Sequence, residues 1–589
     1  MMSKRLRDLI LVFVLALVVR LAAALLLIRP GYMDAAYYAA GAVQLAQGGG
    51  LNEPFLWNYL DDPAGLPHPG FLYWMPLPSL LAAPLAVLFP GSFFALQLPF
   101  TLLSALLPPV AYGLAWATSS RRQVAWLAGL LTLFSGFFFP YWTLPETFAP
   151  FALTGSLTLW LAGRRMPGAG RQILDAGRWL LVGLLVGLAH LTRADGILLL
   201  PVVALASLIS SSRRTTHHAT HITRHVSSPV IRDLAFVFLG YLLVMVPWFL
   251  RNLSITGTPL SPAGAKTLWL RTYDDVFCYR CDLSLRSYLG WGWVDILRSK
   301  LWAAGMNAAR FLAEDCLVFF LPFVLIGLYR LRRCPPFTLS LIYLLLVYFA
   351  HSLAFTFPGP RGGFFHASAA VLPSLFTAGA EGLEVTVRWA ARRRRWNPRQ
   401  AQGVFAVATV VAAVALSGYV AVQRLSAWRD ADAVYLKVDA WLARQGAEDA
   451  TVMVGNPPAF WYHTGHPAVV VPNGDVDTLL AVADRYGVGY VVLDPNRPEG
   501  LAELDAGEGI AGLALVATFD GGQVQLYRRT ELQTSRLFLL SPGREGQDLA
   551  NARTHSLSCA LCPSCGILEV CREPGCTWRV GEVWQTRLR

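Results

Sequence analysis

The sequence predicts a mainly α-helical protein that crosses a membrane about eleven times and carries a small α/β domain outside the membrane. Three observations lead to this prediction. The 589 residues are 55% hydrophobic and only 15% charged, whereas soluble domains carry roughly 25% charged residues. The mean hydropathy is +0.45, and apolar runs of span length recur through the first three quarters of the chain. Basic residues gather in the short segments between those runs.

We expect each long apolar run to form one membrane-spanning helix. The predicted spans lie at about 9–28, 93–117, 124–141, 146–162, 178–192, 195–210, 232–250, 316–331, 337–357, 366–386 and 402–422. A further apolar run, Pro76 to Phe89, is short and holds Pro76, Pro78 and Pro84. We expect this run to lie at the interface or to re-enter the membrane without crossing it.

The positions of the basic residues predict the topology. Lys and Arg cluster in segments whose only acids are Asp8 and Asp175, namely 1–8, 119–123, 163–178, 211–232, 330–333 and 387–399. Eleven alternating spans place all these segments on the side of the N-terminus, as the positive-inside rule requires. We therefore predict a multi-pass plasma-membrane protein with a cytoplasmic N-terminus and an extracytoplasmic C-terminal domain. This pattern accounts for the net charge of +12, and the absence of any nucleic-acid-binding module argues against nucleic acid as a partner.

Three regions are expected along the chain. Residues 1–425 form the transmembrane domain, with outer loops at 29–92 and 251–315. Residues 426–530 form an extracytoplasmic α/β domain, because short β-type runs such as 450–454 and 489–494 alternate with helical segments. Residues 531–589 form a cysteine-containing tail without clear periodicity, in which disulfides and a metal site both remain open. In the outer loop, Cys278 and Cys281 favour a local disulfide or free thiols over a metal site.

Two carboxylates on the predicted outer face are candidate catalytic residues. Asp34 follows the first span and is flanked by Tyr37 and Tyr38. A carboxylate there can accept a proton from a hydroxyl, and the tyrosines can bind a sugar face. Glu146 begins the fourth span on the same side and can orient a substrate hydroxyl. The structural alternatives are that Asp34 caps a helix and that Glu146 favours a helix N-terminus.

Basic residues at the outer ends of spans predict an anion site. Arg193 lies between two apolar runs, where a charge must face protein or a polar ligand. A lipid phosphate would suit it, and an ion pair with Asp195 is the structural alternative. Arg251, followed by Asn252, and Arg361 lie where the positive-inside rule disfavours basic residues. Each alone is explained by snorkelling, but three arginines on one face predict an anion site.

In this order and topology, these motifs resemble those of the GT-C superfamily of membrane glycosyltransferases that use polyprenyl-phosphate sugars. The similarity is to the protein O-mannosyltransferase and aminoarabinose transferase group, of the glycosyltransferase family 39 type. It covers about the first 370 residues and rests on Asp34 with Tyr37 and Tyr38, the stretch His68 to Leu77, Glu146, Leu191 to Arg193, and Pro247 to Asn252 with Gly257 to Pro259. Two positions depart from the family pattern, since Ala35 replaces a second acid and Glu146 replaces an aspartate.

The resemblance implies an inverting glycosyltransferase that moves a sugar from a polyprenyl phosphate to a hydroxyl of a lipid, glycan or protein at the outer face. It implies that Asp34 is the catalytic base or binds the acceptor, and that Arg193 binds the carrier phosphate. We predict Asp34 and Glu146 as catalytic residues. The predicted substrate-binding residues are Tyr37, Tyr38, His68, Arg193, Arg251, Asn252, Arg361 and His366. The sequence does not require a divalent metal, and no metal ligand is predicted.

Two other functions fit the composition. A transporter or flippase of lipid-linked sugars also uses many spans with buried charges. It would show paired broken helices in two related halves, and no such internal repeat is visible in the sequence. A non-catalytic scaffold that displays the 426–530 domain is the third possibility.

Overall fold

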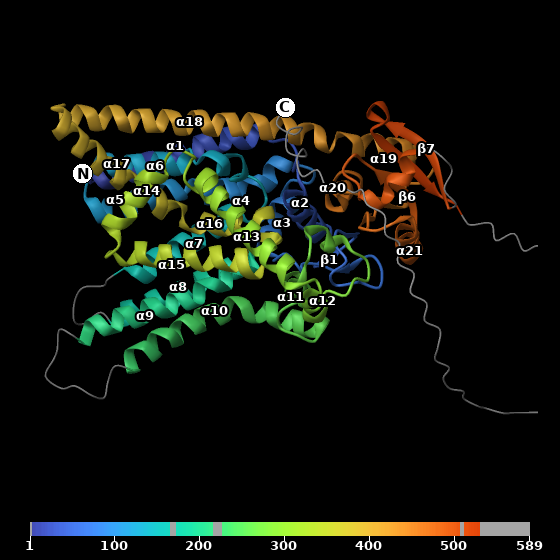
Figure 1. The fold of residues 1–589 in the computed structure, drawn as a ribbon, viewed down its shortest axis with the longest axis horizontal. Helices are drawn as coiled ribbons and strands as arrows, with labels where there is room; N and C mark the ends of the chain where they lie inside the picture. The colour runs from blue at the N-terminus through green and yellow to red at the C-terminus, as the bar shows by residue number, and fades with distance from the viewer. Residues whose placement is uncertain (1–2, 165–171, 216–226, 507–511, 531–589) are drawn as a thin grey trace, which may run out of the picture. The chain divides into compact units, whose positions relative to one another are not determined.

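A computed structural model describes residues 3–164, 172–215, 227–506 and 512–530 of this chain. The protein is mainly helical, and its labelled strands lie at one side of the ribbon, toward helices α19, α20 and α21 (Figure 1). The predicted tail, residues 531–589, lies outside the described residues. Residues Met1–Leu532 form one compact unit.

The helices of the first half range from short 3-10 turns to the 30-residue helix α10. They are α1 (Lys4–Leu26), α2 (Met33–Ala46), α3 (Leu77–Leu88), α4 (Phe93–Ala105), α5 (Leu107–Ser119), α6 (Arg122–Leu133), the 3-10 helix η1 (Gly136–Tyr141), α7 (Phe148–Gly163), α8 (Gln172–Thr192), the 3-10 helix η2 (Ala194–Leu198), α9 (Leu199–Thr215) and α10 (Ser227–Thr256).

The second half alternates short helical turns with long helices. It contains α11 (Pro262–Lys266), η3 (Thr267–Trp269), η4 (Tyr273–Phe277), α12 (Leu285–Gly290), α13 (Trp293–Arg310), the π-helix η5 (Phe311–Asp315), α14 (Leu321–Leu331), α15 (Pro335–Phe349), the π-helices η6 (Ala350–Ala354) and η7 (Gly359–Gly363), α16 (Phe364–Ser368), η8 (Ala369–Val371), α17 (Leu372–Arg394), α18 (Pro398–Ala431), α19 (Ala433–Arg444), α20 (Pro457–Thr464) and α21 (Val476–Tyr486), with η9 (Glu499–Ala506) and η10 (Asp520–Gly522) near the C-terminal end.

Several helices have the length and composition of membrane spans. Within the described ranges, five segments qualify, namely Lys4–Leu26, Phe93–Ser119, Pro229–Thr256, Pro335–Ala354 and Pro398–Arg444. They coincide with predicted spans. Large apolar side chains lie exposed on these helices, such as Val18 (58%), Leu243 (60%) and Val407 (63%). Exposed apolar faces of this extent suit a lipid environment. The count of eleven spans stays a prediction.

The two acids within the predicted cytoplasmic segments are both paired with arginines. Asp8 accepts hydrogen bonds from the Nε and Nη2 atoms of Arg122 at 2.5 and 2.8 Å, which joins α1 to α6. Asp175 accepts from Arg178 at 2.7 Å and lies 3.3 Å from Arg232, which joins α8 to α10. Pairing offsets the cost of burying these carboxylates.

The strands form one six-stranded sheet and a small two-stranded one. The large sheet has the order β2 (Phe55–Leu56), β5 (Ala468–Val470), β4 (Thr451–Val454), β6 (Val488–Leu493), β8 (Val524–Arg529) and β7 (Leu513–Phe519), and the small sheet pairs β1 (Asn52–Glu53) with β3 (His68–Pro69). The pairs between β2, β5, β4 and β6 are parallel, whereas β8 is antiparallel to both β6 and β7.

Local sequence explains the sheet and its helix. Strand β4 reads Thr-Val-Met-Val and is almost completely buried, as parallel strands covered on both faces are. Helix α21 starts at Asp475, whose side chain accepts a hydrogen bond from the Thr478 N–H, and it ends at Gly487 with φ +65°. Its apolar face, including Leu479 and Val482, is buried against the sheet.

One edge of the sheet comes from the segment predicted as the first outer loop, residues 29–92. Strand β2 lies about 400 residues before β5 in the chain, yet Phe55 and Leu56 pair in parallel with Ala468 and Val469. The Tyr59 hydroxyl donates to the Val470 carbonyl at 2.5 Å. The loop and the C-terminal segment therefore fold together, and a domain boundary at residue 425 stays a prediction. Further along, Cys278 and Cys281 form a local disulfide.

We expect Phe55→Ala to destabilise the junction between the loop and the sheet. Phe55 is fully buried and packs against Tyr37 and Trp461, with ring centroids at 5.9 and 6.0 Å. Removing a buried phenyl ring costs about 3 to 5 kcal/mol. The apparent Tm in detergent should fall clearly. Leu515→Ala, at a side chain that is 46% exposed, is the control and should change the Tm little. Equal Tm values for the two variants would contradict this account of the junction.

Candidate active site

One cavity collects many of the polar residues singled out above. It has a volume of about 320 Å³ and is bordered by residues of α2, the loop before α3, the α8 to η2 turn, η4, η6 and η7. Asp34, Tyr38, Arg193, Arg361 and His366 all line it. The carboxylate predicted as a base and the guanidinium predicted to bind phosphate therefore face the same space.

Asp34 lies in the first turn of α2, which begins after a sharp bend. Tyr32 is the N-cap residue of α2, so the alternative in which Asp34 caps the helix does not hold. Gly31 makes the bend with φ +76°, and a Cβ there would meet the Cβ of Trp428 at 2.3 Å. Trp428 belongs to α18 and stacks on Tyr32, with ring centroids at 5.2 Å. The start of α2, and with it Asp34, is thus fixed against α18.

Glu146 and His366 form an ion pair next to Asp34. Glu146 lies between η1 and α7, and its Oε1 atom is 3.0 Å from Nε2 of His366 on α16. The other carboxylate oxygen, Oε2, accepts a hydrogen bond from the Phe148 N–H at 3.1 Å. Glu146 therefore does bind a helix N-terminus, as the structural alternative held, while it also belongs to the polar cluster.

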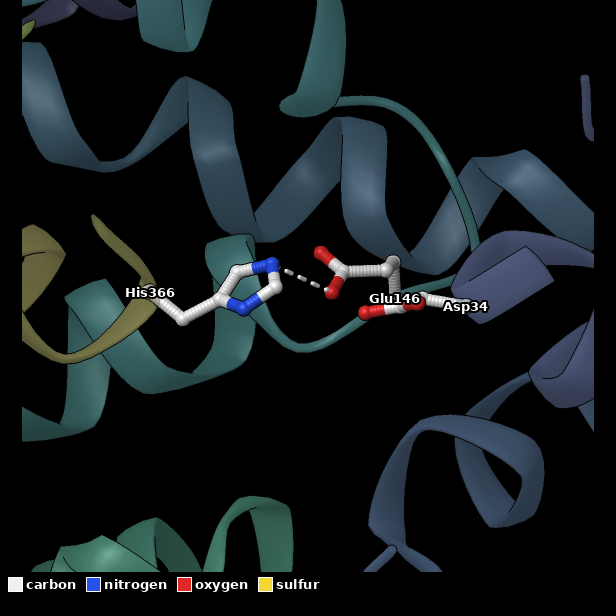
Figure 2. Close-up of side chains that lie close together, drawn as sticks. All are labelled: Asp34, Glu146 and His366. Atoms are coloured by element: carbon white, nitrogen blue, oxygen red, sulfur yellow. Dashed lines mark ion pairs between the residues drawn. The ribbon is translucent and has the colours of Figure 1, made fainter. Parts of the chain in front are cut away.

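Asp34, Glu146 and His366 come together from three distant parts of the chain (Figure 2). One ligand atom from each lies within 4.8 Å of the others. Two carboxylates and an imidazole at this spacing fit the donor preferences of a divalent cation such as Zn²⁺. A cation bound there would polarise an oxygen of the substrate.

The two acids have different electrostatic environments. Asp34 lies outside the predicted spans, and burial raises its pKa to about 6, with nearby Glu146 adding to the rise and the charges of His366 and Arg193 opposing it. Glu146, at the start of the predicted fourth span, is instead paired with His366 at 3.0 Å. Two neighbouring acids in such unlike environments can take different roles in proton transfer.

Arg193 makes the ion pair that was its structural alternative, and it also lines the cavity. Its Nε and Nη2 atoms donate to the two carboxylate oxygens of Asp195 at 3.0 and 2.8 Å. The guanidinium carbon lies 5.8 Å from the centre of the Phe151 ring. Because this bidentate pair uses only one edge of the guanidinium, the remaining N–H groups can donate hydrogen bonds to an anion.

Arg361 is held differently from Arg193. It belongs to η7 and lies over the ring of Tyr273, 4.9 Å from the centroid. Among the residues that the structure describes, no carboxylate forms an ion pair with it. Its positive charge is therefore less compensated than that of Arg193.

Four predicted substrate-binding residues have other partners and do not line the cavity. The Tyr37 hydroxyl donates to the buried carboxylate of Glu53, and His68 lies 3.1 Å from the Phe55 carbonyl. Arg251 donates to the Leu51 and Gly70 carbonyls at 3.0 and 2.8 Å. Asn252 donates to the Pro259 carbonyl at 3.3 Å. In the structure these side chains hold the outer loops in place.

The cavity also contains residues that the sequence alone did not single out. His351 on η6 lies 3.2 Å from Asp195, and Tyr273 forms an aromatic wall together with Tyr73 and Trp74, which belong to the stretch His68 to Leu77. The sequence does contain a signal for His351, because an ionisable residue inside an apolar run of span length is a candidate functional residue. Tyr273 had no such signal because its place in the cavity depends on how the second outer loop folds.

Comparison with known proteins shows a structural likeness without a close sequence relative. No family model matches the sequence, and no curated protein is significantly similar to it. A solved structure of ArnT from Cupriavidus metallidurans bound to undecaprenyl phosphate is similar with a TM-score of 0.52, at 14% identity over 89% of this chain and 98% of that one.

A second solved structure supports the same fold. The oligosaccharyltransferase of Archaeoglobus fulgidus, in complex with Zn and sulfate, has a TM-score of 0.52 at 16% identity, over 82% of this chain and 68% of that one. Both proteins are GT-C glycosyltransferases. The chain therefore shares the fold of these two proteins, as the resemblance of its sequence motifs implies.

Proposed function

We propose that this protein is an inverting membrane glycosyltransferase that moves a sugar from a polyprenyl phosphate to an acceptor hydroxyl. The observation that carries the proposal is the shared cavity, in which Asp34 faces the same space as Arg193 and Arg361. A base and an anion site are the two elements that this transfer needs. The similar ArnT structure contains undecaprenyl phosphate, which supports this class of donor.

In the proposed reaction, Asp34 accepts the proton of the acceptor hydroxyl as that oxygen attacks the anomeric carbon. The bond from this carbon to the phosphate oxygen breaks on the opposite face, and its electron pair stays on the polyprenyl phosphate. A pKa of about 6 leaves Asp34 mostly ionised at neutral pH yet still able to take a proton. Glu146, paired with His366, stays charged and orients the hydroxyl.

The arginines and aromatic residues would hold the donor. Arg193 and Arg361 stabilise the charge that develops on the leaving phosphate, and this effect is strong where water is excluded. Tyr38, Tyr73 and Trp74 line the cavity and offer faces on which a sugar can stack. The reaction as written needs no metal ion, although Asp34, Glu146 and His366 could hold one.

The proposed location follows from the charge pattern and the fold. We propose eleven spans in the plasma membrane and a cytoplasmic N-terminus. The large sheet, which forms the α/β part of the protein, would lie outside the cell. The cavity would then open toward the outer face, where lipid-linked sugars and lipid, glycan or protein acceptors meet. No role for nucleic acid is proposed.

Asp34→Asn should abolish transfer while donor binding persists. The amide cannot accept the proton, and general-base catalysis contributes about 10² to 10⁴ in rate. The assay measures turnover of a radiolabelled polyprenyl-phosphate sugar by purified protein with a panel of acceptors. The control is Asp295→Asn, which changes an acid on α13 whose side chain is 46% exposed. Wild-type turnover in Asp34→Asn would remove Asp34 from the mechanism. Movement of the donor across vesicles without any transfer would instead favour a flippase.

Arg193→Ala and Arg361→Ala should each weaken donor binding by about tenfold or more, because each removes charge-assisted hydrogen bonds to the phosphate. Arg193→Lys should not restore full affinity, since an ammonium lacks the planar edge that pairs with Asp195. The KM for the donor measures the effect. Arg298→Ala, at a side chain that is 79% exposed, is the control, and unchanged donor KM values in the cavity variants would contradict the phosphate role.

Removal of divalent cations with EDTA should leave the transfer rate unchanged. His366 already compensates the charge of Glu146 at 3.0 Å, and a cation would have to displace this contact. Rates measured before and after chelation, with metal content determined in parallel, test the expectation. Loss of activity that Mn²⁺ or Zn²⁺ restores would instead make Asp34, Glu146 and His366 a metal centre.

A further inference from the structure

His351 is a buried ionisable residue of the cavity that the proposed reaction does not use. It lies on the π-helix η6, and its side chain is only 7% exposed. Its Nε2 atom is 3.2 Å from Oδ2 of Asp195, so the ring N–H donates to the carboxylate. The other ring nitrogen, Nδ1, has no hydrogen-bond partner in the described part of the chain. The imidazole therefore has one polar contact, and that contact is with Asp195.

Asp195 in turn orients Arg193. The same oxygen that meets His351, Oδ2, accepts from Nη2 of Arg193 at 2.8 Å, while Oδ1 accepts from Nε at 3.0 Å. Three side chains thus form a chain of contacts from η6 to the turn between α8 and η2. Because His351 and Arg193 bind the same carboxylate oxygen, the position of the guanidinium depends on the position of the imidazole.

The opposite side of the His351 ring rests on η7, the segment that carries Arg361. A Cβ at Gly363 would lie 2.8 Å from Cε1 and 2.9 Å from Nδ1 of His351. A Cβ at Gly359 would lie 2.1 Å from the His351 carbonyl oxygen. Both glycines lie within two residues of Arg361, so the position of η7 depends on where His351 lies. π-helices such as η6 and η7 often occur at functional sites.

We propose that His351 is a positioning residue for the donor phosphate: it fixes Asp195, which orients Arg193, and it sets the position of η7 and so of Arg361. Both arginines line the same cavity, so the two guanidiniums can bind one phosphate group there. This inference rests on the proposed function, because it assigns His351 to the anion site of that same cavity.

The test compares His351→Phe, His351→Gln and Gly363→Ala in the full-length protein. His351→Phe keeps a ring of similar shape but cannot donate, so the donor KM should rise about tenfold with kcat nearly unchanged. His351→Gln keeps an N–H donor and should recover much of the affinity. Gly363→Ala leaves every polar group in place and displaces the ring, and it should raise the KM in the same way.

Direct binding measurements distinguish a role in positioning the phosphate from a general effect on the shape of the cavity. The probes are undecaprenyl phosphate and the neutral alcohol undecaprenol, with Kd values measured in detergent micelles. His351→Phe should weaken binding of the phosphate about tenfold and leave the alcohol unchanged. His463→Asn is the matched control, since it breaks another buried histidine–aspartate contact, to Asp432 at 3.1 Å, which does not border the cavity.

The outcomes distinguish this inference from the proposed function. If the wild type binds neither probe and transfers no sugar, the proposed function is wrong. If the wild type binds the phosphate and the His351 variants bind it equally well, the positioning role is wrong. Equal losses for phosphate and alcohol would also overturn it, because they would show that His351 only shapes the cavity.

Discussion

The contact between Glu146 and His366, at 3.0 Å, is the interaction on which the arrangement of the cavity depends. It joins the start of α7 to α16 and compensates a buried carboxylate that would otherwise be costly. Asp34 comes within 4.8 Å of this pair and forms no ion pair with any described residue, and burial raises its pKa to about 6. The unequal pairing of two neighbouring acids gives the cavity one stable charge and one group able to exchange a proton.

The loop 29–92, which carries Asp34, is held from both sides. Within the loop, the buried carboxylate of Glu53 accepts hydrogen bonds from the Tyr37 hydroxyl and from the Phe71 N–H, the latter at 2.7 Å. Beyond the loop, strand β2 pairs with β5 of the large sheet. The C-terminal segment therefore stabilises the loop that lines the cavity through backbone hydrogen bonds.

The sequence singled out residues that share one cavity where a charge stood out against an apolar background. Asp34, Arg193 and Arg361 are ionisable groups near span ends, where a charge is costly unless it faces protein or a ligand, and the structure places all three around one cavity. The sequence did not separate residues that line the cavity from residues that support the loops around it. His68 and Arg251 looked equally suitable, yet they bind main-chain carbonyls, and no spacing in the sequence reveals such a partner.

The sequence by itself determined the helical, lipid-adapted character of the chain, the order of its motifs and its resemblance to the GT-C superfamily, because hydropathy and charge placement act locally. The tertiary structure decided which residues meet. Glu146 and His366 are more than 200 residues apart in the chain, and β2 joins a sheet whose other strands lie near the C-terminus. Such pairings depend on how helices pack and how distant loops close, and the energy of a buried ion pair is defined only once its neighbours are in place.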